Sequence, residues 1–303
     1  MTAPKASGRT FIYHAIAIFT AVVWGATFVS TKVLLGNGLT PAEIFLYRFI
    51  LAYAGIRIVS RQKLWADSRR DELLLAAAGV TGGSLYFLFE NTALGITLAS
   101  NVSLIVCTAP VMTAFLIRLF HKEERVGTKR IGGSLIALAG VGLVVFNGHF
   151  ILKISPLGDT LSTLAALMWA FYGLILKRLD TRYPVMFITR KVFAYGLLTL
   201  LPYFLFKPPA TDWHTLLRPI VLSNLLFLGL LASMLCYILW NTAVKELGAV
   251  RTSVYIYLQP PVTLLTSAMI IREQITPVAL AGSALIIGGV WLSERKSDVA
   301  QMP

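Results

Sequence analysis

Residues 90–110 read ENTALGITLASNVSLIVCTAP, and residues 240–260 read WNTAVKELGAVRTSVYIYLQP. Set 150 residues apart, the two stretches share identical residues in one register: Asn-Thr-Ala at 91 and 241, Ala at 99 and 249, Ser at 103 and 253, and Pro at 110 and 260. Chance matching in a hydrophobic chain is the alternative, but it produces scattered Leu and Ala matches rather than Asn, Ser and Pro in register. The pattern therefore predicts two repeats, residues 1–150 and residues 151–303.

The overall composition predicts a membrane protein. The chain has 303 residues, of which 56% are hydrophobic and 14% are charged, and its mean hydropathy is +0.73. A soluble protein has about 25% charged residues, because much of its surface faces water. These values exclude an ordinary soluble enzyme. The net charge of +13 would favour nucleic-acid binding in a soluble chain, but here the basic residues lie between apolar runs and no nucleic-acid partner is predicted.

Ten apolar runs are long enough for membrane-spanning helices, which need about 20 residues each. They lie at about 13–35, 41–59, 72–94, 98–120, 128–147, 157–177, 185–206, 219–244, 248–270 and 275–293. The runs are continuous rather than alternating, which disfavours a β-barrel and favours helices. We expect an all-α membrane protein with ten transmembrane helices, five in each repeat. Because five is odd, the second repeat must be inverted in the membrane, an architecture common among secondary transporters.

The positions of Lys and Arg predict the orientation in the membrane. With the N-terminus in the cytoplasm, 19 basic residues fall on the cytoplasmic side and 4 on the outer side, which satisfies the positive-inside rule. The first apolar run continues to about Leu35, which is too long for the apolar region of a signal peptide. We therefore expect an uncleaved first span, both termini in the cytoplasm, and a location in the cell inner (plasma) membrane.

Motifs for cofactors and catalysis do not occur in the sequence. There is no GxxxxGK[ST] motif for an ATP-driven pump, and no HExxH or GxSxG motif. Cys107 and Cys236 both lie in apolar runs and form neither a CxxC pair nor a disulfide framework. The four histidines are scattered, so we predict no metal site, no cofactor and no catalytic residue. A secondary transporter is favoured over an intramembrane enzyme or a receptor.

The repeated motifs form a pattern along the whole chain. In the first half they are Trp24-Gly25, Asn91-Thr92-Ala93-Leu94, Ala99-Ser100-Asn101-Val102-Ser103, Ala109-Pro110-Val111 and Lys122-Glu123-Glu124. In the second half they are Asn241-Thr242-Ala243, Gly248-Ala249, Ser253, Gln259-Pro260-Pro261-Val262 and Arg272-Glu273. The pattern resembles the drug/metabolite transporter superfamily, with two EamA-type domains of five helices each. Within it, the chain is most similar to the bacterial aromatic amino acid exporters.

The resemblance implies export of small organic metabolites by alternating access around a central cavity between the repeats. Aromatic and other large apolar amino acids are the expected substrates, with drugs, purine-like metabolites or other amino acids as the alternatives. The expected partners are the small-molecule substrate and the lipid bilayer, with the chain a monomer or a homodimer. One position departs from the repeat, because Gly25 follows Trp24 whereas Ala170 follows Trp169. Whether the two tryptophans share one role is therefore open.

Aromatic and amide residues are predicted to line that cavity. In the run at 72–94, Gly79, Gly83, Tyr86 and Glu90 are spaced to share one helix face. Tyr and Trp combine an apolar ring with a hydrogen-bond donor, which suits an aromatic zwitterion, and Asn can bond its ammonium or carboxylate. The predicted substrate-binding residues are Trp24, Tyr86, Asn91, Asn101, Trp169, Tyr237, Trp240 and Asn241. Helix packing is the alternative explanation for the small residues on these faces.

Charged residues within the runs are predicted to act in gating or coupling. An ionisable side chain inside a membrane is costly and is by default a functional candidate. We expect Glu90 to pair with Lys32 or Arg48 when the outer side closes, or to carry a proton. Snorkelling to the nearest interface is the alternative, and it is the favoured explanation for Arg190 and Lys191.

Two prolines are predicted to shape the helices that carry them. Pro110 and Pro260 lie within equivalent runs, and each ring clashes with the carbonyl four residues back, at Val106 or Ile256. We expect a kink at each proline and a freed carbonyl able to bind a polar group. The alternative is a kink that only fits the packing and is satisfied by neighbouring groups.

Overall fold

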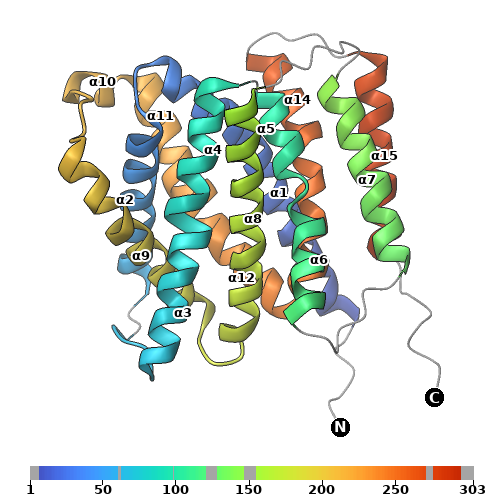
Figure 1. The fold of residues 1–303 in the computed structure, drawn as a ribbon, viewed down its shortest axis with the longest axis horizontal. Coiled ribbons are helices and arrows are strands. Elements are labelled where there is room, and N and C mark those ends of the chain that lie inside the picture. Colours follow the sequence, from blue (N-terminus) through green and yellow to red (C-terminus); the bar gives the residue numbers. More distant parts are fainter. Residues whose placement is uncertain are drawn as a thin grey trace.

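The computed structural model describes residues 7–60, 63–97, 99–120, 128–146, 155–270 and 276–294, and every regular element in them is a helix (Figure 1). In chain order the elements are α1 (Ser7–Gly36), α2 (Pro41–Val59), α3 (Arg69–Gly79), the π-helix η1 (Val80–Ser84), α4 (Leu85–Ile96), α5 (Ala99–Val106), α6 (Ala109–Phe120), α7 (Thr128–Phe146), α8 (Pro156–Leu179), α9 (Val185–Phe206), α10 (Trp213–Leu217), α11 (Pro219–Leu226), the π-helix η2 (Phe227–Leu235), α12 (Cys236–Leu247), α13 (Ala249–Ser253), the 3-10 helix η3 (Val254–Leu258), α14 (Gln259–Ile270) and α15 (Pro277–Glu294). The prediction of an all-helical protein is confirmed for these residues.

Within the described residues, six helical stretches are long and apolar enough to cross a membrane, and the chain is therefore a multi-pass membrane protein. They are Thr10–Gly36, Arg69–Ile96, Val102–Phe120, Pro156–Leu179, Val185–Phe206 and Pro219–Leu247. Two shorter apolar stretches lie at Ile131–Leu143 and Leu280–Ser293. The helix α2 has 19 residues but carries three charged ones, Glu43, Arg48 and Arg57, which lower its hydropathy.

The turn between α1 and α2 shows how local sequence sets the helix boundaries. Gly38 adopts a positive φ of 93°, which an L side chain rarely does. Thr40 then caps α2: its side chain accepts from the Glu43 N–H, while the Glu43 carboxylate accepts from the Thr40 N–H at 2.8 Å. Pro41 occupies the first helical turn, where its missing N–H costs nothing. The same Glu43 carboxylate accepts the backbone N–H groups of residues 210 and 211, which ties α2 to the loop after α9.

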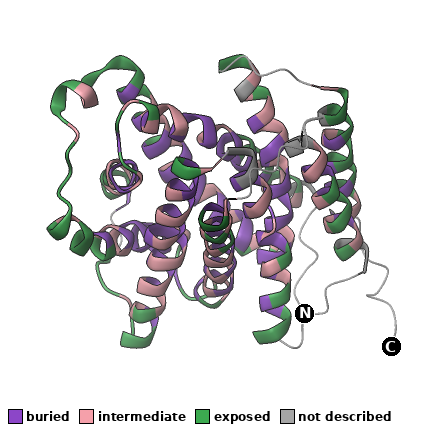
Figure 2. Ribbon diagram, turned by 45° about the horizontal axis from the view of Figure 1, so that its top comes forward, coloured by how far each residue is buried: buried purple, intermediate pink, exposed green. Residues whose placement is uncertain are grey.

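The two halves of the sequence are packed into one another. The first-half helix α1 lies against α12 and α14, α4 lies against α8, and α2 lies against η2 and α9. Buried residues gather at these contacts, whereas exposed residues cover the periphery (Figure 2). Large apolar side chains on the periphery, such as Leu205, Phe206 and Met269, are more than 80% exposed. Such a surface suits lipid rather than water as the solvent.

The helices α7 and α15 form a close pair at one side of the bundle (Figure 1). A Cβ atom added to Gly133 would lie 2.5 Å from the Gly289 carbonyl oxygen, and one added to Gly140 would lie 2.6 Å from the Gly282 oxygen. Only glycine permits this backbone approach, as in many membrane helix pairs. The start of α1 and the end of α15 lie together at the lower end of the bundle in Figure 1.

Candidate functional site

A central cavity lies where the two halves meet. Its lining residues are Trp24, Thr27, Phe28, Arg48, Tyr86, Phe87, Glu90, Val106, Trp169, Tyr237, Ile256 and Gln259. They come from α1, α2, α4, α5, α8, α12, η3 and α14. The free volume is about 30 Å³, which is room for ordered water but not for an amino acid. A larger ligand therefore requires the lining helices or side chains to move apart.

Aromatic rings form one wall of the central cavity. The Trp24 and Trp169 rings meet edge to face, with centroids 5.1 Å apart and planes at 88°. Tyr86 lies 5.1 Å from Trp169, and Tyr237 lies 5.9 Å from both tryptophans. Trp240 packs behind Trp24 at 4.9 Å and is not among the lining residues. The sequence-predicted aromatic residues are thus brought together, four of them at the cavity surface.

Both π-helices hold an aromatic residue of this wall in place. The Tyr237 hydroxyl donates to the Gly82 carbonyl in η1 at 2.5 Å, and the Trp24 indole N–H donates to the Ala232 carbonyl in η2 at 2.9 Å. A π turn leaves backbone groups outside the regular α-helical pattern and often marks a functional site. Within the described residues no such hydrogen bond fixes the Trp169 indole, so the two tryptophans are held differently.

The charged residues of the central cavity are deeply buried. Arg48 is 2% exposed; its Nε donates to the Ser233 hydroxyl at 2.9 Å, and its guanidinium carbon lies 4.1 Å from the centre of the Phe87 ring. Glu90 is 7% exposed and accepts a hydrogen bond of 2.8 Å from the Tyr86 hydroxyl. Lys32 donates to the Thr97 carbonyl at 3.4 Å. In the part of the chain that the structure describes, Glu90 pairs with neither Lys32 nor Arg48, and the predicted gating pair stays a prediction.

The predicted asparagines lie outside the lining of the central cavity. Asn241 accepts from the Tyr172 hydroxyl at 2.8 Å and donates to the Thr189 hydroxyl at 2.9 Å, which joins α12 to α8 and α9. Asn91 donates to the Pro41 carbonyl at 3.2 Å. The Asn101 backbone belongs to α5, but its side chain lies outside the described residues. The roles of these asparagines in substrate binding stay predictions.

Each of the two prolines is the second residue of a helix. The α-helical pattern is interrupted between Val106 and Ala109, and α6 begins at Ala109, immediately before Pro110. The helix α14 begins at Gln259, immediately before Pro260 and directly after the 3-10 helix η3. The regular α-helical pattern therefore changes just ahead of each proline, and the predicted kinks stay predictions. The Ile256 carbonyl accepts the Gln259 N–H and lies 3.7 Å from the Cys107 thiol, which donates to it.

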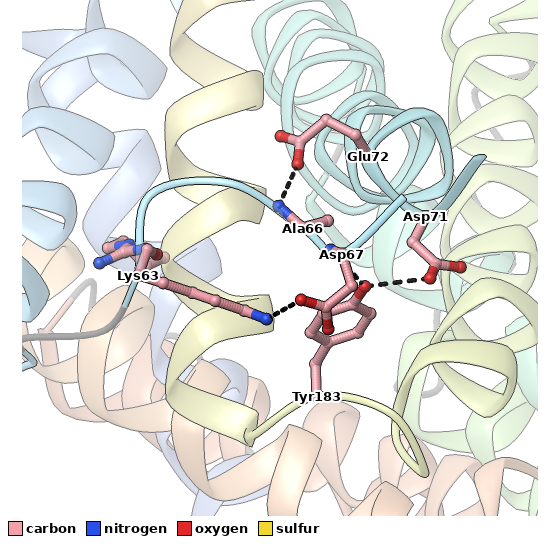
Figure 3. Close-up of polar contacts among 7 residues, drawn as sticks. Lys63, Ala66, Asp67, Asp71, Glu72 and Tyr183 are labelled. Carbon is pink, nitrogen blue, oxygen red and sulfur yellow. Dashed lines mark hydrogen bonds and ion pairs between the residues drawn. The ribbon is translucent and has the colours of Figure 1, made fainter. Parts of the chain in front are cut away.

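A second group of charges, the polar cluster, lies at the start of α3, at the lower end of the bundle in Figure 1. It consists of Asp71, Glu72, Arg182, Tyr183, Lys191 and Tyr195. Figure 3 shows part of it, with Asp71, Glu72 and Tyr183. Asp71 binds the Arg182 guanidinium at 2.7 Å and the Tyr183 hydroxyl at 3.0 Å. Glu72 binds the side chains of Lys191 and Tyr195 and accepts the Ala66 N–H at 2.7 Å. The cluster fastens the start of α3 to α9 and to the corner between α8 and α9.

The polar cluster was missed in the sequence, where Lys191 is expected to snorkel. In the structure its side chain is only 8% exposed and pairs with Glu72. The available signal is that Asp71 and Glu72 stand at the start of one apolar run and Lys191 lies inside another, so that each needs a partner. Among the described residues there is no group of three or more His, Cys, Asp or Glu side chains able to hold a metal ion.

Comparison with known proteins adds an independent observation. The EamA-like transporter family matches the chain over residues 11–146 and again over residues 156–295. A probable terminal-alkyne amino-acid exporter of Streptantibioticus cattleyicolor is 28% identical over 282 residues, which are 92% of each chain. A probable amino-acid metabolite efflux pump of Escherichia coli is 26% identical over 291 residues, which are 92% of this chain and 93% of the pump.

A solved crystal structure shares the fold. It superposes with a TM-score of 0.74 at 16% sequence identity and covers 94% of this chain and 98% of its own. The resemblance drawn from the repeated motifs is confirmed by the family match, which covers most of the sequence in two segments. The chain belongs to the EamA-like transporter family.

Proposed function

We propose that the protein is a secondary transporter that exports aromatic and other large apolar amino acids. The observation that carries the proposal is the central cavity, where Trp24, Tyr86, Trp169 and Tyr237 form an aromatic wall beside one buried cation and one buried acid. Aromatic rings accept another ring edge to face or in an offset stack. Two relatives of similar length are named as a probable terminal-alkyne amino-acid exporter and a probable amino-acid metabolite efflux pump, which supports export of amino acids or their metabolites.

The proposal includes the arrangement of the chain in the membrane. Residues 1–150 and 151–303 form two inverted repeats of five transmembrane helices, with α2, α7 and α15 among the ten. The two separate family matches support this division. The start of α1 and the end of α15 lie at one end of the bundle (Figure 1), which supports placing both termini on one side. The excess of Lys and Arg assigns that side to the cytoplasm of the inner (plasma) membrane.

Counterflow in liposomes tests the substrate. Vesicles containing the purified protein and loaded with unlabelled phenylalanine should accumulate labelled phenylalanine, tryptophan and leucine, and the solute recovered should be unmodified. Trp169→Ala should reduce the initial rate about tenfold, because each aromatic contact is worth about 0.5–1.5 kcal/mol and the shape of the wall is lost as well. Trp213→Ala is the matched control, because Trp213 is 78% exposed on α10.

Other results would point elsewhere. Accumulation of a purine or a cationic drug, without accumulation of any amino acid, would show that the proposed substrate class is wrong and that the protein is still a transporter. Conversion of the solute to a product would favour an intramembrane enzyme. Equal loss of rate in Trp169→Ala and Trp213→Ala would contradict the aromatic wall as the binding surface.

A further inference from the structure

Arg48 carries hydrogen-bonding capacity that the protein does not use. Its guanidinium is 2% exposed, and only Nε has a hydrogen-bond partner, the Ser233 hydroxyl. Among the described residues nothing accepts a hydrogen bond from the two terminal nitrogens, and neither is sealed in the packing, since Arg48 lines the central cavity. A buried guanidinium that forms no ion pair is costly. Such a group in a cavity is suited to an anionic ligand.

The surroundings of Arg48 fix the direction in which it can bind. Ser233 in η2 is fully buried and holds the inner edge of the guanidinium through Nε. The Phe87 ring lies 4.1 Å from the guanidinium carbon and covers one face of the plane. The outer edge, formed by the two terminal nitrogens, remains for the ligand. Two parallel N–H groups in a fixed plane match the two oxygens of a carboxylate.

Glu90 presents the opposite charge to the same cavity. One carboxylate oxygen accepts the Tyr86 hydroxyl at 2.8 Å, and the other has no partner among the described residues. Glu90 and Arg48 both line the cavity but form no ion pair with each other. A direct pair would satisfy both groups and leave nothing for a ligand. Their separation leaves a place for a molecule that carries both charges.

We infer that Arg48 binds the α-carboxylate of the transported amino acid and that Glu90, steadied by Tyr86, binds its α-ammonium group. This inference rests on the proposed function and specifies how the substrate class is recognised. Trp24 and Trp169 then face the substrate side chain. Recognition requires Arg48 and Glu90 to stay apart while substrate is bound, whereas the gating role predicted from the sequence requires one of them to meet a partner.

The test compares substrates that lack one charge. Unlabelled phenylalanine, phenylalaninamide (no carboxylate) and 3-phenylpropionate (no ammonium) compete with labelled phenylalanine in counterflow. The wild type should prefer phenylalanine over each analogue by at least about tenfold, because a site built to bind a polar group rejects a ligand that lacks it. Arg48→Gln should weaken competition by phenylalanine at least about tenfold and competition by phenylalaninamide less than about threefold. Glu90→Gln should weaken competition by phenylalanine at least about tenfold and competition by 3-phenylpropionate less than about threefold.

Controls keep the result interpretable. Arg57→Gln removes the same charge from an exposed position of the same helix and should keep the wild-type preference. Quenching of tryptophan fluorescence by each ligand gives binding without transport. If a variant does not fold, the wild-type preference alone decides. Equal competition by phenylalanine and phenylalaninamide in the wild type, or equal weakening of both in Arg48→Gln, would overturn the inference and leave amino-acid export standing. Absence of counterflow with every amino acid would instead refute the proposed function.

Discussion

The central cavity and the polar cluster both bury charge, but they satisfy it differently. In the polar cluster Glu72 meets Lys191 and Asp71 meets Arg182, and tyrosine hydroxyls complete each carboxylate. In the cavity Arg48 has a hydroxyl and a ring for partners, and it forms no ion pair within the described residues. Charges paired inside the protein join its parts. A buried charge that forms no ion pair costs stability, which fits the ligand proposed for Arg48.

The largest expected effect is the loss of the buried pair in the polar cluster. Glu72→Ala leaves the Lys191 ammonium without its acid and the Ala66 N–H without its acceptor. Removing one partner of a fully buried pair costs about 3–5 kcal/mol. Glu72 is 18% exposed, so the cost here lies towards the lower end, and Tm of the purified protein should still fall clearly in a scan at fixed rate. Asp67→Asn is the control, since Asp67 is 68% exposed and should leave Tm unchanged. A Tm equal to the wild type in Glu72→Ala would show that the cluster does not fasten this end.

The second prediction has the opposite sign for stability. Arg48→Met removes a buried cation that forms no ion pair among the described residues and keeps the length of the side chain. Replacing a buried charge by an apolar group is often neutral or stabilising by about 1–4 kcal/mol, so Tm should stay the same or rise while counterflow is lost. A fall in Tm as large as that of Glu72→Ala would show that Arg48 stabilises the fold as the charges of the polar cluster do, and the proposed difference between the two regions would be wrong.

The smallest effect is expected at the rim of the polar cluster. The Arg182 side chain is 57% exposed, although it binds Asp71 at 2.7 Å. Exposed ion pairs contribute about 0–1 kcal/mol, and Tyr183 still binds Asp71 when Arg182 is gone. Arg182→Gln should therefore change Tm very little and counterflow not at all. A large loss of Tm or of counterflow would mean that the exposure of an ion pair in the polar cluster does not indicate how much the pair contributes to stability.

The sequence predicts the helical class and the family because both rest on patterns that run along the chain. Apolar runs of sufficient length set the helices, and their repetition carries the resemblance. The spacing of Tyr86 and Glu90 on one helix face likewise anticipates their appearance together in the central cavity. Asn91 follows Glu90 directly, however, and neighbouring residues in a helix point about 100° apart. In the structure Asn91 therefore turns to the start of α2 rather than to the cavity.

Other features depend on contacts that the sequence does not display. The polar cluster joins residues more than 100 positions apart, such as Glu72 and Lys191, and a charge pattern gives no pairing over such a separation. The amino-acid composition of the π-helices η1 and η2 does not distinguish them from α-helices. The prolines illustrate a third limit: at the start of a helix a proline lacks no needed N–H, so a proline within an apolar run indicates an interruption without giving its position.

The burial of Cys107 and Cys236 has a practical consequence. Both side chains are 0% exposed, and they are the two cysteines of the chain. Buried thiols react slowly with water-soluble reagents, so the natural protein should give little background labelling with maleimides. Neither cysteine then has to be replaced, and the contact of Cys107 with Ile256 is kept. A thiol introduced by Trp213→Cys on α10 or by Arg57→Cys on α2 would report the accessibility of opposite ends of the bundle in intact cells. The proposed orientation, with both termini in the cytoplasm, predicts that an impermeant fluorophore labels the first position and not the second.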